Sequence, residues 1–149
     1  MKDDTLRARI HEVLQSQHFM TLATLRADGY PQASIINYSA DDLTVYFATD
    51  AASQKVANIA FNNKVSAAIA LETQDLYKLS GLSMTGVARR ILEKEMADEC
   101  SLRLFRRLPQ SKRYVPRDPG ELALFAVTPV AISLIDYSAG FGTTHLFKP

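Results

Sequence analysis

The sequence has a single cysteine, no tryptophan, and only six glycines and six prolines among its 149 residues. One cysteine cannot form an intramolecular disulfide, and the position of Cys100 in an expected helix predicts a packing role. No apolar run approaches the roughly 20 residues that a membrane-spanning helix needs. The net charge of +1 creates no overall field that would favour nucleic acid or a membrane surface.

What is present is the composition of an ordinary globular protein, with 47% apolar and 22% charged residues. The length suits one domain with a substantial core, so we expect residues 1–149 to form a single domain. No signal peptide is recognisable, and we therefore expect a soluble cytoplasmic protein.

Short strand patterns dominate the chain, and few helices separate them. Apolar residues at helical spacing predict helices over residues 3–17, 53–63 and 93–108. Alternating or β-branched runs predict strands over residues 19–26, 30–39, 43–48, 64–72, 77–92, 121–127 and 130–137. Gly81 and Gly86 suggest bends or bulges, and Thr128-Pro129 should separate the last two strands. The pattern favours a mainly β fold, a small β-barrel with flanking helices, over a βαβ fold.

The stretch from Leu43 to Asn63 reads as a strand, a turn and a helix whose N-cap is Ser53. Lys55 lies in the first turn of this helix, where a cation is normally unfavourable. If the turn binds an anion, the backbone N–H groups, the Ser53 hydroxyl and the Lys55 ammonium would converge on one phosphate. The alternative is a solvated lysine that tolerates its position.

The order of segments resembles the FMN-binding split-barrel proteins, the pyridoxamine 5′-phosphate oxidase-like group. The resemblance covers roughly residues 19–147 and rests on ATLRADGYPQASIINY, VYFATDAASQKVANIAFNN, VSAAIAL, TGVARRI and DYSAGFG. The family pattern F-x-T-x-x-x-S-x-K, with an Asn a few residues on, is matched by Phe47, Thr49, Ser53, Lys55 and Asn58.

The resemblance implies an FMN-binding split β-barrel that forms a homodimer, with two FMN molecules at the subunit interface. The residues matching Ser53 and Lys55 would hold the phosphate, and the strand matching Ala33 to Tyr38 would line the isoalloxazine ring. The implied cofactor-binding residues are Ala33, Ser34, Ile35, Ile36, Ala48, Thr49, Ser53, Gln54, Lys55 and Asn58.

The chain departs from the oxidases themselves. Gln54 stands where they usually carry Arg, and Ala33 and Tyr38 stand where their second strand is basic. Their closing Arg-Leu-x-Pro segment is missing from THLFKP. We therefore expect a flavin site but little or no oxidation of pyridoxamine phosphate.

No acid–base or nucleophile constellation is evident, so the catalytic residues are not identified. His11, His18 and His145 match no zinc motif, and no metal site is expected. A flavin supplies its own hydride or electron transfer. The sequence therefore predicts an FMN-dependent oxidoreductase of a small molecule. The alternatives are a haem-binding or haem-degrading relative and a non-catalytic flavin-binding stress-response protein.

For two further segments, the sequence leaves two alternative roles open. Gly140-Phe141-Gly142 is either a bend at a barrel corner or a turn that approaches the cofactor pocket. The basic segment from Arg103 to Arg117 is either a solvated helix end matched to the helix dipole, or a rim for an anionic substrate or haem propionates. It is a poor nucleic-acid site, because it is short and offers few aromatic residues for stacking.

The predicted dimer should bury well over ~1,000 Å² through strand faces that are apolar and composed of small residues. The two faces expected there are Ser66/Ala68/Ala70 and Thr44/Tyr46/Ala48.

Overall fold

The computed structural model describes residues 1–114 and 118–149. The helices are α1 (Asp3–Ser16), α2 (Gln54–Phe61) and α3 (Lys94–Arg107). The strands are β1 (Phe19–Leu25), β2 (Pro31–Asn37), β3 (Ser39–Asp41), β4 (Thr44–Asp50), β5 (Lys64–Ala70), β6 (Ser80–Arg90), β7 (Leu122–Asp136) and β8 (Thr144–Phe147). Short 3₁₀ turns cover Leu76–Lys78, Pro109–Tyr114, Pro119–Glu121 and Tyr137–Ala139.

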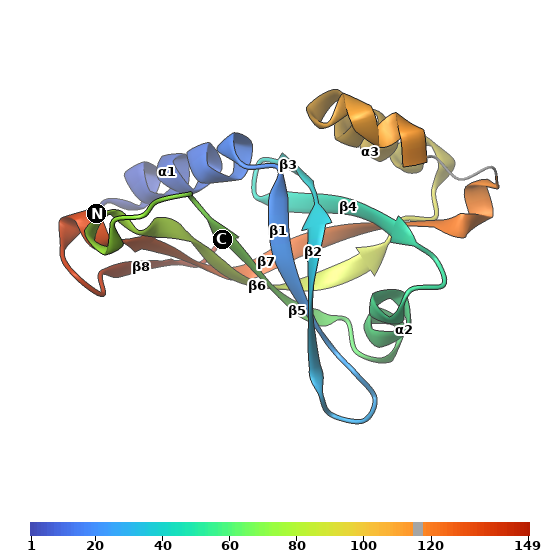
Figure 1. Ribbon diagram of the computed structural model, residues 1–149, viewed down its shortest axis with the longest axis horizontal. Helices are drawn as coiled ribbons and strands as arrows, with labels where there is room; N and C mark the ends of the chain where they lie inside the picture. The colour runs from blue at the N-terminus through green and yellow to red at the C-terminus, as the bar shows by residue number, and fades with distance from the viewer. Residues whose placement is uncertain (115–117) are drawn as a thin grey trace.

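The strands form one antiparallel sheet in the order β2-β1-β5-β6-β7-β4-β3, and β8 pairs with β7. The sheet curls until β2 comes close to β4, which gives a half-barrel flanked by three helices (Figure 1). This confirms the predicted split-barrel architecture. Within the described part of the chain β2 pairs only with β1, so its outer edge offers backbone groups without a strand partner.

The two longest strands, β6 and β7, pair with each other along the sheet. The expectation of a break at Thr128-Pro129 was wrong, because β7 runs continuously through both residues. A β-bulge accommodates the proline. Gly86 lies opposite Pro129 and Thr85 lies opposite Ala131, so Val130 has no partner on β6. A Cβ on Gly86 would lie 2.6 Å from the Thr128 carbonyl oxygen, so this close approach requires glycine.

Other element boundaries also differ from the sequence expectations. The long strand predicted from Tyr77 begins only at Ser80, after a 3₁₀ turn. The strand predicted over residues 30–39 is divided into β2 and β3, and β8 was not expected at all.

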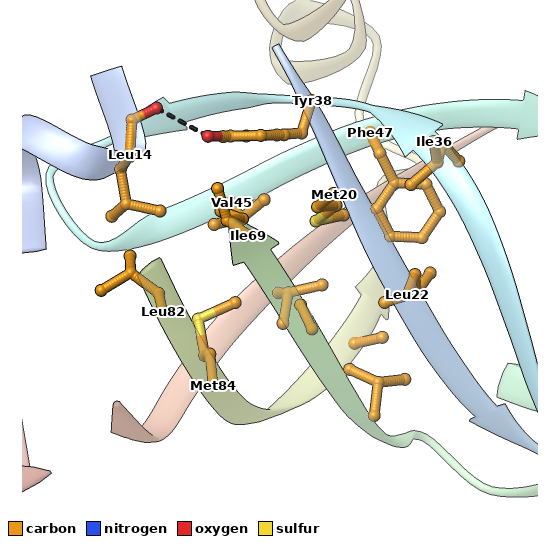
Figure 2. Packing of buried hydrophobic residues seen from close by; sticks show 14 of the residues in the cluster. Leu14, Met20, Leu22, Ile36, Tyr38, Val45, Phe47, Ile69, Leu82 and Met84 are labelled. Carbon is orange, nitrogen blue, oxygen red and sulfur yellow. Dashed lines mark hydrogen bonds between the residues drawn. The ribbon is translucent and has the colours of Figure 1, made fainter. Parts of the chain in front are cut away.

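The main hydrophobic core fills the inside of the half-barrel, and α1 closes one end of it (Figure 2). Phe47 of β4 stacks on Phe125 of β7 with ring centroids 5.1 Å apart. The Tyr38 hydroxyl donates to the Leu14 carbonyl oxygen of α1 at 2.9 Å. Burial raises the pKa of Tyr38 to about 12, and the positive charge of Arg107 offsets only part of this rise.

A second, smaller cluster lies outside the barrel, where α3 packs against β4 and β7. Its buried members are Ile91, Cys100, Leu104, Leu124 and Ala126, with Tyr46 and Ala48 of β4 packed against them. Cys100 is 2% exposed and its pKa is raised by burial to about 11, which confirms a packing role. Part of the strand face predicted for a dimer interface, at Tyr46 and Ala48, is thus covered by this chain's own helix.

In the described residues no helix is long and apolar enough to cross a membrane.

Candidate functional site

The turn between β4 and α2 brings three polar side chains together. The Thr49 hydroxyl oxygen, near the end of β4, lies 3.4 Å from the Ser53 hydroxyl oxygen. The half-buried Lys55 ammonium donates to the same Thr49 oxygen at 3.3 Å. These three predicted site residues therefore converge on one point beside the first turn of α2.

Local hydrogen bonds fix this turn. The Asp50 carboxylate accepts from the Ala52 N–H at 2.8 Å, and the Asp50 carbonyl accepts from the Ser53 N–H at 3.0 Å. Ser53 occupies the N-cap position as predicted, yet its hydroxyl makes no capping hydrogen bond. The hydroxyl therefore remains beside Thr49, where it can contact a ligand.

The electrostatics of the start of α2 favour an anion, although the Asp50 carboxylate lies in the preceding turn. The first turn of α2 carries no acidic residue, and the helix dipole adds positive potential at this end. None of the ion pairs found within residues 1–114 and 118–149 includes Lys55. An ammonium, two hydroxyls and the N–H groups of a helix start form a donor set suited to a phosphate.

The four predicted residues of β2 lie on two faces of the strand. Ala33 and Ile35 point outward, and Ile35 is 80% exposed. Ser34 is half-buried, while Ile36 is in the main core beside Phe47 (Figure 2). This strand can therefore offer a ligand its outer-edge backbone groups and only part of its side chains.

Asn58 is the buried centre of a polar network that includes the exposed Gln54. The Asn58 side-chain oxygen accepts from the Gln54 amide at 2.8 Å. The Asn58 amide nitrogen donates to Thr24 Oγ1 and to Gln32 Oε1, both at 2.9 Å. Asn58 is only 1% exposed, so this predicted cofactor-binding residue lies behind the surface of the site.

The structure contains an apolar groove that the sequence did not predict. It has a volume of about 460 Å³ and lies between α3 and the ends of β1, β2 and β4. Its lining includes Ala48 from the predicted cofactor set, and no charged residue lines it among residues 1–114 and 118–149. The lining residues are Phe19, Asn37, Ala48, Ser101, Leu104, Phe105, Leu108, Gln110, Ser111 and Leu122. The regular spacing of Leu104 and Leu108 was visible in the sequence, but their partners from β1 and β2 were not.

Two arginines of the basic segment are held within the fold. Arg103 contacts the carboxylates of Asp41 at 3.0 Å and Glu99 at 2.8 Å. Arg107 hydrogen-bonds the Gln17 carbonyl and lies over the Tyr38 ring, 5.5 Å from its centroid. The segment continues through the exposed Lys112 and Arg113 to Arg117, which lies outside the described residues.

The Gly140-Phe141-Gly142 turn does form a bend, with positive φ at both glycines. Phe141 is 69% exposed and packs against Tyr137, with ring centroids 5.2 Å apart. The turn precedes β8 at the opposite end of the molecule from α2 (Figure 1). Within one chain it does not reach the α2 site.

The histidines do not form a site. His11 and His18 are exposed, and His145 lies on β8 opposite Leu134. Over the described residues no group of three or more His, Cys, Asp or Glu side chains could hold a metal ion.

Several solved structures share this fold. A haem-binding protein from Mycobacterium smegmatis is 20% identical with a TM-score of 0.81, over 99% of this chain and 59% of that protein. General Stress Protein 26 from Bacillus anthracis str. Sterne is 21% identical with a TM-score of 0.74, over 97% and 98% of the two chains. HutZ, the haem storage protein from Vibrio cholerae, is 17% identical with a TM-score of 0.72, over 99% and 95%.

This chain thus spans 59% of the length of the Mycobacterium smegmatis protein. No curated protein matches its sequence. A family model described as pyridoxamine 5′-phosphate oxidase matches residues 6–136, which is most of the chain. Together with the curled antiparallel sheet, this match shows that the chain belongs to the pyridoxamine 5′-phosphate oxidase family.

Proposed function

We propose that the chain binds FMN at the β4–α2 turn and acts as an oxidoreductase of a small molecule. The observation that carries the proposal is the convergence of Thr49, Ser53 and Lys55 at the start of α2. This donor set fits the FMN phosphate in charge and in hydrogen-bonding capacity. The free edge of β2 supplies backbone donors and acceptors for the polar edge of the flavin ring.

Bound FMN supplies hydride or electron transfer, and the protein binds and orients it. Lys55 and the two hydroxyls hold the phosphate end, and β2 holds the ring end. An apolar groove under α3 also includes Ala48 of the predicted cofactor set. Gln54, in the place of the oxidases' Arg, bonds to Asn58 and adds no charge, which argues against pyridoxamine phosphate as the substrate.

We further propose a homodimer that forms through the outer face of β5 and β6. Ala68 and Ala70 of β5 are exposed there, and Val130 of β7, which is 60% exposed, lies near Ser66 and Thr85. A depression of about 410 Å³ crosses this face and continues onto β1. Light scattering at micromolar concentration should report a dimer, and Val130→Asp should weaken it. A monomer that still binds flavin would contradict the dimer proposal.

Haem binding is the second candidate function. It is favoured by the apolar groove and by the fold shared with haem-binding and haem storage proteins. The visible absorption spectrum of the purified protein separates the two candidates, because flavin and haem absorb at different wavelengths. Mass spectrometry of the released molecule, together with titration of the stripped protein with FMN and with haemin, completes the test. Tight binding of haemin with no binding of FMN would overturn the FMN proposal.

A further inference from the structure

Asn58 lies where two parts of the proposed FMN site meet. It is on α2, one turn beyond Lys55, and its side chain points to the β1–β2 hairpin. Thr24 and Gln32, which it contacts, are directly opposite each other in the pairing of β1 with β2. One side chain therefore connects the helix to both strands of the hairpin.

The hydrogen-bonding capacity of the Asn58 amide is used within the protein. Its two N–H groups are donated to Thr24 and Gln32, and its oxygen accepts from Gln54. A primary amide has two donor hydrogens. Asn58 could therefore donate to a cofactor only by breaking a buried hydrogen bond, and at 1% exposure it does not reach the surface.

The network spans both ends of the proposed site. Gln54 lies between Ser53 and Lys55, at the phosphate end. Gln32 immediately precedes Ala33 on β2, at the ring end. We propose that Asn58 is a positioning residue that holds α2 and β2 at the separation at which one FMN molecule contacts both.

This inference rests on the proposed FMN binding and predicts a particular kind of defect. A ligand that spans two subsites gains affinity from their fixed spacing, and loosening the spacing removes this gain. Ligands that occupy a single subsite should be affected much less. Riboflavin, which lacks the phosphate, reports on the ring end alone.

The test compares the dissociation constants of FMN and riboflavin for the unmodified full chain, Asn58→Leu, Gln32→Leu and Thr24→Val. Asn63→Leu, at an exposed position just after the same helix, is the matched control. We expect the preference for FMN over riboflavin to fall about 2- to 10-fold for each hydrogen bond removed. The control should keep the full preference, and visible circular dichroism of bound FMN should change only in the network variants.

Gln32→Leu and Thr24→Val keep the test decisive if Asn58→Leu does not fold. An unchanged preference for FMN in both of these variants would overturn the inference while leaving FMN binding intact. A preference that falls in Asn58→Leu alone would also overturn it, because it would indicate direct contact of Asn58 with the cofactor. If the unmodified protein binds no FMN, the proposed function fails and the inference fails with it.

Discussion

Helix α3 lies against β4 and helix α2 lies against β1, and the two helices present their cations in opposite ways. Lys55 at the start of α2 contacts a hydroxyl, and no described carboxylate pairs with it. Arg103 and Arg107 on α3 contact carboxylates, backbone carbonyls and an aromatic ring of the same chain. Arg103 and Arg107 are thus less available to an external anion than Lys55, although Lys112 and Arg113 of the same segment are exposed.

The two helices also differ in the contacts that attach them to the sheet. Besides the buried Val56 and Ile59, the polar network of Asn58 ties α2 to the β1–β2 hairpin, whereas the buried residues of α3, Cys100 and Leu104, belong to the second apolar cluster. We therefore expect substitutions under α3 to change stability, and substitutions at the start of α2 to change ligand affinity.

The largest expected effect is on stability, from Leu104→Ala. Leu104 is 4% exposed in the second cluster, so its truncation should lower the free energy of unfolding by about 2–5 kcal/mol. Urea unfolding of the apo-protein measures this. Leu102→Ala, at a position that is 48% exposed, is the control and should stay within about 0.5 kcal/mol of the unmodified protein. Equal losses in the two variants would show that α3 does not depend on this cluster.

The next effect concerns the reactivity of Cys100. Because burial raises its pKa to about 11, the thiolate fraction at pH 8 is lowered, and thiolate is the reactive form. Alkylation by iodoacetamide should therefore be at least ~100-fold slower in the native protein than in urea, and Leu104→Ala should accelerate it. Rapid labelling of the unmodified native protein would indicate that α3 opens readily.

Lys55→Ala tests the other side of the comparison. It removes one charge-assisted hydrogen bond, about 1.5–3 kcal/mol, so FMN should bind roughly 10- to 150-fold more weakly. The melting temperature of the apo-protein should not fall, because Ala is a better helix former than Lys.

Lys148→Ala, at an exposed position, is the control for loss of charge. Added salt should weaken FMN binding more in the unmodified protein than in Lys55→Ala. Unchanged affinity would mean that the phosphate binds elsewhere.

The sequence predicted the parts of the fold that depend on neighbouring residues. The strand–turn–helix around Ser53 follows from local alternation and an N-cap preference, and both were found in the structure. The continuity of β7 through Pro129 was not predictable in this way, because the bulge that accommodates it involves Gly86, a residue far away in the chain.

The long-range contacts at the candidate site were not predictable from the sequence either. Asn58 was grouped with the cofactor residues on the basis of a motif, but its partners Thr24 and Gln32 lie 34 and 26 residues away. The outward face of β4 was recognised as apolar, but alternation alone cannot show whether a second subunit or α3 covers Tyr46 and Ala48.

The smallest expected effect, from Arg103→Ala, sharpens the comparison between the helices most directly. The side-chain hydrogen bonds of Arg103 to Glu99 and Asp41 raise its pKa, and its side chain is 34% exposed. Partly exposed ion pairs contribute little, so the free energy of unfolding should fall by no more than about 1 kcal/mol. FMN affinity, measured by the same titration as for Lys55→Ala, should be unchanged, because the charge of Arg103 is already neutralised within the chain. A loss of affinity as large as that of Lys55→Ala would show that α3 contributes to the anion site, and the distinction between the two helices would fail.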